Sequence, residues 1–141
     1  MNPGTSPTFI FNRKRYTSQT GILVNLSHRG LEERVPPQVE IAAYRIVQEA
    51  LTNVARHAAV THVDVRLWAS SQELGVQIED QGVGFDLHKN ESVYKSQGIA
   101  GMRERAANCG GNLEIETSPG KGVCVTAEFP LTRPDQHQES I

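Results

Sequence analysis

The feature that most constrains this fold is the alternation of apolar and polar residues in five short stretches. Successive side chains of a strand point to opposite faces, so each alternating stretch predicts a strand with one buried face. The stretches are residues 22–27, 61–69, 74–78, 113–117 and 123–129. A few turn-forming residues join the second stretch to the third and the fourth to the fifth, which predicts two hairpins. We therefore expect a mainly antiparallel sheet.

Helical spacing of apolar residues occurs in two long stretches. The first, residues 37–58, begins with Pro37, and proline suits the first turn of a helix because an N–H there would have no partner. The second, residues 98–109, is followed by glycine at position 110 and is expected to bury Ile99, Met102, Ala106 and Cys109. Spacings of three and four residues predict one buried stripe on the first helix, formed by Val39, Ala43, Ile46, Val47, Ala50 and Val54.

The order of these elements predicts an α+β fold. We expect a two-layer α/β sandwich, with a mixed but mainly antiparallel sheet and helices on one face. Regular strand–helix alternation, which a doubly wound nucleotide fold requires, is missing, and so is a Gly-x-x-x-x-Gly-Lys-Ser/Thr phosphate loop. Along the chain, we interpret residues 1–20 as a leader or linker remnant, 21–131 as one domain and 132–141 as a C-terminal tail.

Charge and cysteine content exclude several classes of protein. The 141 residues carry a net charge of -2, so no nucleic-acid binding is expected from bulk electrostatics. Cys109 and Cys124 have neither disulfide nor metal-ligand spacing and are expected to be buried, reduced thiols. The sequence shows no signal peptide and no apolar run long enough to span a bilayer, which favours the cytoplasm.

Polar residues stand at the edge of the apolar stripe near the end of the first helix. Glu49 precedes Asn53 by four residues, so a carboxylate and an amide lie side by side. Their oxygens can coordinate Mg²⁺, and a carboxylate can also accept a proton or orient water. Arg56 and His57 follow at the helix end, where basic groups suit phosphates. The alternative is a solvated helix flank.

A second polar residue ends the strand pattern of residues 74–78. The next inward position is Asp80, followed by glycines at positions 82 and 84 that allow close backbone approach. A buried carboxylate there can accept a hydrogen bond from an amino group such as that of adenine. An ordinary turn is the alternative, because Asp and Gly favour turns.

The start of the second helix is the third such feature. Residues 98–105 open this helix after a long polar loop, and a helix N-terminus presents free N–H groups to anions. A long loop in a small domain is unusual unless it closes over a ligand. The alternative is a plain helix N-terminus with glycine packing.

These three stretches, in this order, resemble the GHKL family of ATP-binding domains, which includes gyrase B, Hsp90, MutL and the histidine kinases. Residues 44–57 are similar to its N box, Asp80-x-Gly82-x-Gly84-Phe85-Asp86 to its first glycine box and residues 98–106 to its second. Arg-Ile-x-Gln-Glu-Ala-Leu-Thr-Asn and Gly-Met-Arg-Glu-Arg are similar to the NarX/DesK type of two-component sensor kinase. The resemblance covers residues 21–131 and implies the Bergerat form of the two-layer sandwich.

The resemblance implies a site for ATP and Mg²⁺. Asn53 would ligate Mg²⁺, and Glu49 would assist the metal or the transferred phosphate. Arg56 and His57 would lie near the phosphates, and Asp80 would hold the adenine amino group. The remaining nucleotide-binding positions that the family motifs imply are Gly82, Gly84, Gly98, Ile99, Gly101 and Met102.

The implied reaction passes the γ-phosphoryl group of ATP to a histidine on a dimerisation domain, and then to a response regulator. Such transfer depends mostly on positioning and charge stabilisation. The helical phospho-acceptor segment is missing, and His28 lies on the first predicted strand without the surroundings of an acceptor. The resemblance thus implies a catalytic domain that is incomplete without its acceptor, monomeric alone, and cytoplasmic or the cytoplasmic part of a membrane-bound sensor.

Two positions depart from the family pattern. Val123 stands where the family often has a threonine near the adenine, and Ser96 replaces a glycine two residues before Gly98. We expect both to alter affinity or lid motion without abolishing nucleotide binding. Two other readings remain: a nucleotide-binding interaction module that transfers no phosphate, and an anti-sigma-factor serine kinase of related fold.

Overall fold

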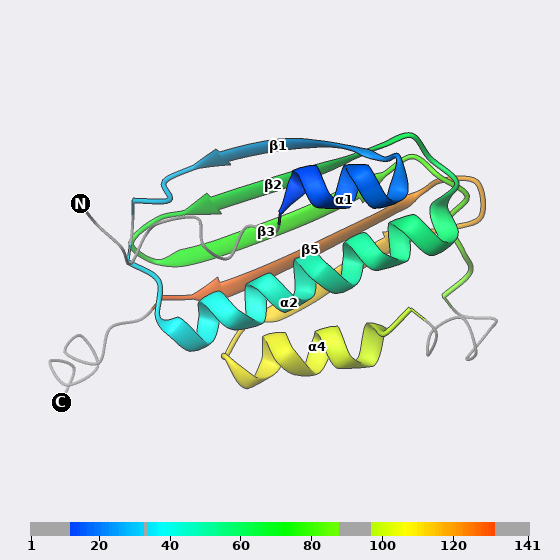
Figure 1. Cartoon of the computed structure of the whole chain (residues 1–141). Coiled ribbons are helices and arrows are strands. Elements are labelled where there is room, and N and C mark those ends of the chain that lie inside the picture. The colour runs from blue at the N-terminus through cyan, green and yellow to red at the C-terminus, as the bar shows by residue number, and fades with distance from the viewer. Residues whose placement is uncertain (1–11, 33, 88–96, 132–141) are drawn as a thin grey trace, which may run out of the picture.

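The computed structural model describes residues 12–32, 34–87 and 97–131 (Figure 1). Its elements, in chain order, are α1 (Arg13–Thr20), β1 (Leu23–Arg29), α2 (Pro37–Asn53), the π-helical turn η3 (Val54–Ala58), β2 (His62–Ala69), β3 (Glu73–Asp80), α4 (Ile99–Asn108), β4 (Asn112–Thr117) and β5 (Val123–Pro130). Among these described residues, no helix is long and apolar enough to cross a bilayer.

The five strands form one mixed sheet in the order β1-β2-β3-β5-β4. β2 and β3 pair antiparallel, as do β4 and β5, so both predicted hairpins are confirmed. β3 also pairs antiparallel with β5, while β1 joins the edge of the sheet parallel to β2. Figure 1 shows the helices on one face of the sheet. The predicted α+β sandwich is therefore confirmed.

The core lies between α2 and the inner face of the sheet. All six stripe residues predicted on the first helix are buried, because their spacing keeps them on one side of α2 and η3. Alternate residues of the central strands face this stripe, and Phe129 of β5 is fully buried among them. The opposite sheet face is polar, with Arg66 of β2 bonded to Gln77 and Glu79 of β3.

The long helix differs from its prediction near its end. Residues 37–58 were expected to form one regular helix, but the α-helix ends at Asn53 and the chain continues as the wider turn η3. Ala59, in the left-handed conformation with φ 59°, then ends the helical segment. The apolar spacing does not reveal the wider turn, because Val54 and Ala58 are buried with it in place.

The prediction of buried thiols is wrong, because both cysteines are only partly buried. Cys109 falls at the end of α4, where the backbone leaves helical geometry, and its Sγ lies 3.6 Å from the carbonyl oxygen of Gln38. Cys124 lies on the polar face of the sheet, beside Thr126. The helical period predicts an inward Cys109, whereas the alternation that buries Val125 and Phe129 already places Cys124 on the opposite face of the sheet.

The segment that we interpreted as a leader contains the helix α1. Asn12 caps it by accepting a hydrogen bond from the Arg15 N–H, and Gly21 ends it in the left-handed conformation. None of its residues is fully buried, although the Tyr16 hydroxyl donates to a carbonyl of α2. The rest of the leader, residues 1–11, and the tail, residues 132–141, lie outside the described residues.

Replacing Phe129 by alanine is expected to lower the free energy of unfolding by about 3–5 kcal/mol, because the fully buried ring would leave a cavity. Leu23→Ala is the control, because that side chain is 62% exposed and should change the same free energy by no more than about 0.5 kcal/mol. Urea titration followed by circular dichroism measures both. Equal losses would contradict the placement of the core.

Candidate functional site

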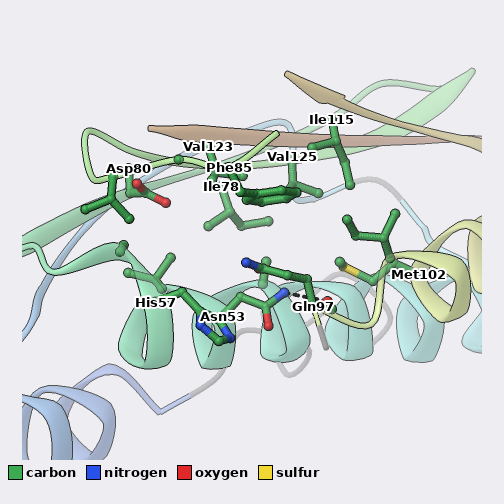
Figure 2. A pocket seen from close by; sticks show the side chains of 16 residues that line it. Asn53, His57, Ile78, Asp80, Phe85, Gln97, Met102, Ile115, Val123 and Val125 are labelled. Atoms are coloured by element: carbon green, nitrogen blue, oxygen red, sulfur yellow. Dashed lines mark hydrogen bonds between the residues drawn. The ribbon is translucent and has the colours of Figure 1, made fainter. Parts of the chain in front are cut away.

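A cavity lies between the end of α2, the sheet and the start of α4 (Figure 2). Its walls are mostly apolar: Ile78, Ile115, Val123 and Val125 from the sheet side, and Ile99 and Met102 from α4. The polar groups that reach the cavity are Asn53, His57, Asp80 and Gln97. An apolar cavity with a few convergent polar groups is the usual form of a small-molecule site.

Asp80 ends β3 and is the buried acid of this cavity, with 4% of its surface exposed. Its Oδ1 accepts a hydrogen bond from the Gly82 N–H at 2.7 Å. Burial raises the pKa of the Asp80 carboxyl, hydrogen bonds with the backbone of Gly82 and Val123 lower it, and the charge of Glu79 raises it further. Burial is the largest effect, so a ligand that donates a hydrogen bond to this carboxylate would relieve a cost of desolvation.

The loop after Asp80 packs closely against the end of the helix. The Val83 N–H donates to the Ala58 carbonyl oxygen at 3.1 Å, and a side chain at Gly82 would collide with that carbonyl. The Val83 carbonyl in turn accepts from the Gly120 N–H at 2.6 Å. Glycine at position 82 thus allows the close approach that holds the loop between η3 and the turn before β5.

Asn53 connects α2 to the segment before α4. Its Nδ2 donates to the Gln97 carbonyl oxygen at 2.6 Å. Its Oδ1 is buried and has no hydrogen-bond partner among the residues that the structure describes. Because an unsatisfied buried oxygen is costly, a cation is a suitable partner for it.

Glu49 lies one turn before Asn53 and packs against Gly98. A Cβ at position 98 would come within 3.0 Å of the Glu49 Oε2, and Gly98 has a positive φ of 66°. Within the described residues, no cluster of three or more His, Cys, Asp or Glu side chains forms a metal site of protein ligands alone. An amide with one carboxylate fits Mg²⁺, which usually keeps waters and takes phosphate oxygens as its other ligands.

The structure brings some of the predicted site residues together and leaves others apart. Glu49, Gly82 and Gly98 pack beside the cavity without lining it, while Arg56 and Gly101 are exposed outside it. His57 is also exposed but borders the cavity, as Figure 2 shows. The predicted residues that line the cavity are Asn53, His57, Asp80, Gly84, Ile99 and Met102.

Gln97 also lines the cavity and is only 5% exposed, although the sequence motifs do not indicate it. The position of Gln97 directly before Gly98, at the start of the second glycine box, was the sequence signal that could have indicated it. Val123, where the family often has a hydroxyl, does line the cavity. His28 lies exposed on β1, and Ser96, with most of the polar loop, falls outside the described residues.

Comparison with known families identifies the family that has these three motifs around such a cavity. Residues 38–133 match the family described as "Histidine kinase-, DNA gyrase B-, and HSP90-like ATPase". The match includes all three boxes and most of the elements around the cavity. The chain belongs to this family of ATP-binding domains.

Two of its sequence relatives are a histidine-protein kinase/phosphatase and a sensor protein. The chain is 40% identical to the signal transduction histidine-protein kinase/phosphatase DegS of Brevibacillus brevis, over 92% of this chain and 33% of that protein. It is 31% identical to the sensor protein VraS of Staphylococcus aureus, over 86% of this chain and 34% of that protein. The chain thus spans about a third of the length of these relatives.

Solved structures support the fold. The histidine kinase domain of the Erythrobacter litoralis EL346 blue-light activated histidine kinase matches with a TM-score of 0.65 at 24% identity, covering 84% of this chain and 57% of that one. A structure of that blue-light activated kinase matches with a TM-score of 0.67 at 23% identity, covering 88% and 41%. These neighbours share the α+β sandwich.

Asp80→Asn is expected to raise the free energy of unfolding of the ligand-free protein at neutral pH. The pKa of the wild-type carboxyl is raised in the folded state. Between the ordinary pKa of an aspartate and this raised pKa, the folded state therefore binds more protons than the unfolded chain. The free energy of unfolding falls as the pH rises through this range, and the neutral amide of Asp80→Asn does not undergo this loss. Urea titrations at neutral pH and at about pH 3 should show a gain that disappears at acid pH.

Glu114→Gln is the control, because this carboxylate is exposed on β4. Glu114→Gln should not raise the free energy of unfolding at either pH. A neutral-pH stability of Asp80→Asn equal to or below that of the wild type would contradict the dominance of burial at this carboxyl.

Proposed function

We propose that this chain supplies the γ-phosphoryl group of ATP to a histidine on a separate dimerisation domain, for relay to a response regulator. One observation carries the proposal: the cavity joins a buried acid, Asp80, to a buried amide oxygen without a partner, that of Asn53. These are complementary to the two ends of a metal-bound nucleotide, a base with an amino group and a charged phosphate chain. Membership of the ATPase family and the sensor-kinase relatives support the reading.

The Asp80 end of the cavity suits adenine. The base would lie between apolar walls from the sheet and α4, and its amino group would donate to the Asp80 carboxylate. Gly84 lines this end, and Gly82 lets the loop pack tightly enough to leave the carboxylate facing the cavity. Val123 would meet the base through apolar contact, where a threonine would offer a hydroxyl.

The Asn53 end suits Mg²⁺ and the phosphates. Asn53 Oδ1 would ligate the ion, with Glu49 acting on the ion or on the transferred phosphate. A bound Mg²⁺ would neutralise charge on the phosphate oxygens. The backbone around Gly98 and Ile99 would present N–H groups of the α4 N-terminus to the phosphates, with Gly101 and Met102 in its first turn.

The basic residues of η3 would contribute charge from the rim. His57 borders the cavity, and Arg56, which is exposed in this structure, would reach the phosphates only by turning toward them. None of these residues needs to be a strong base, because phosphoryl transfer depends on alignment and charge stabilisation. The proposed cofactors are ATP and Mg²⁺, and the proposed partners are the acceptor domain and a response regulator.

Asp80→Asn is expected to weaken ATP binding roughly 10- to 150-fold, the loss that corresponds to a hydrogen bond to a charged group. Glu79→Gln is the matched control, because its carboxylate is the neighbouring residue on β3 but faces the opposite side of the sheet, toward Arg66. The affinity of Glu79→Gln for ATP should stay within about twofold of that of the wild type. Calorimetric titration measures both, and an unchanged affinity of Asp80→Asn would reject the adenine role.

Asn53→Ala is expected to abolish Mg²⁺-dependent transfer while retaining part of the nucleotide affinity, because the apolar walls and Asp80 stay in place. Gln48→Ala is the control, at an exposed position of α2 five residues earlier. Acid-labile phosphohistidine is measured after adding a dimerisation domain of a related kinase. Mg²⁺-dependent transfer by Asn53→Ala at the wild-type rate would reject the metal role.

The same assay distinguishes the alternatives. ATP binding without any transfer to the added domain would favour an interaction module of the same fold. Acid-stable phosphate on the acceptor would favour a serine kinase.

A further inference from the structure

A tyrosine outside the nucleotide cavity contacts the helix that carries Asn53. The Tyr16 hydroxyl of α1 donates to the carbonyl oxygen of Leu51 at 2.8 Å, and both groups are partly buried at this contact. Figure 1 shows α1 on the same side of the sheet as α2. The contact therefore joins the first described helix to the last turn of α2.

α1 is also bonded to the start of β1. The Thr17 hydroxyl donates to the Ile22 carbonyl oxygen at 2.8 Å, and the Gly21 N–H donates to the Thr17 carbonyl at 2.7 Å. The Gly21 bond is a backbone bond that ends α1, and the Thr17 hydroxyl adds one side-chain contact to the start of β1. Tyr16 therefore reaches α2 from a helix whose end is set by its backbone.

The accepting carbonyl stands where the helix changes its geometry. Leu51 precedes the start of η3 by three residues. The Val54 N–H is shared between the Ala50 carbonyl, which is its regular α-helical partner, and the Leu51 carbonyl. The Tyr16 hydroxyl thus donates to a carbonyl at the point where the α-helix ends. An external donor on a helix carbonyl is a recognised cause of local departures from regular α-helical bonding. The Tyr16 hydroxyl thus favours the wider turn at this point.

The wider turn sets the position of the first glycine loop. η3 places one extra residue in a turn, so it changes the direction of the residues that follow, including His57 and Ala58. The Ala58 carbonyl accepts from the Val83 N–H at 3.1 Å and lies against Gly82. A contact path therefore runs from Tyr16 through η3 to the loop that follows Asp80.

We propose that Tyr16 is a positioning residue: its hydrogen bond to Leu51 stabilises η3 and thereby holds the first glycine loop in place for nucleotide binding. The effect on ATP rests on the proposed function, whereas the effect on η3 does not. Burial and the charge of Asp80 raise the pKa of Tyr16 to about 12, so the hydroxyl keeps its donor proton at neutral pH.

Tyr16→Phe tests the proposal, because it removes the donor and keeps the ring. Thr17→Val is the matched control: it removes a hydroxyl bond of equal length from the same helix, but one directed at Ile22 rather than at α2. Backbone amide shifts of the ligand-free chain and the affinity for ATP are measured for both variants, together with urea midpoints.

We expect Tyr16→Phe to change the amide shifts of residues 53–58 and of Val83, and to weaken ATP binding roughly threefold to tenfold. In the reconstituted transfer, KM for ATP should rise by the same factor, and kcat should fall less than in Asn53→Ala, because the Asn53 side chain is kept. Thr17→Val should shift only amides of α1 and β1 and keep the ATP affinity of the wild type, at a similar loss of stability.

Unchanged shifts at residues 53–58 in Tyr16→Phe would overturn the inference, and so would equal losses of ATP affinity in the two variants. Failure of the wild-type chain to bind ATP would instead reject the proposed function. The amide shifts would still decide whether Tyr16 stabilises η3.

Discussion

The arrangement of the site depends on a carboxylate held in an apolar environment. Asp80 occupies the position where β3 would otherwise bury another aliphatic residue, and almost no water reaches it. A charged oxygen in such a place is stable only when nearby N–H groups compensate for the lost water. The tight loop through Gly82 and the start of β5 at Val123 provide those groups. The loop through Gly82 and the start of β5 therefore pack around this carboxylate.

Asn53 meets the same physical problem in a different way. Its amide is half satisfied: the nitrogen bonds to the Gln97 carbonyl and the oxygen is left without a partner among the described residues. Backbone hydrogen bonds offset part of the cost of burying Asp80, whereas Asn53 Oδ1 has no partner among the described residues. The cavity therefore joins one partly compensated acid to one oxygen without a described partner, an asymmetry that fits a ligand with chemically different ends.

The periodic part of this architecture could be predicted from the sequence. The alternation in β2, β3 and β5 and the spacing along α2 each fix an inward face, so the hairpins and the buried stripe follow directly. The π-helical turn could not be predicted, because residues 54 and 58 have apolar spacing compatible with either turn. Gln97 was missed because its burial depends on packing around the cavity by elements far apart in the sequence, which the spacing of apolar residues does not show. The motif matches likewise did not show that His57 borders the cavity and Arg56 does not, because both exposed residues belong to the same motif.

The parallel pairing of β1 with β2 has a consequence for how the chain assembles. The β2–β3 and β4–β5 ladders join residues near in sequence, whereas the β1–β2 ladder must enclose all of α2 and η3. Closing such a loop costs chain entropy, as it also does for the β3–β5 ladder. β3 and β5 each pair with two strands, whereas β1 pairs only with β2, so fewer bonds offset the cost at this edge. Val24 and Leu26 of β1 pack against the core, so the pairing of this strand gains apolar burial as well as hydrogen bonds. The helix α1, which is bonded to the start of this strand, therefore depends for its position on a pairing between segments far apart in the sequence.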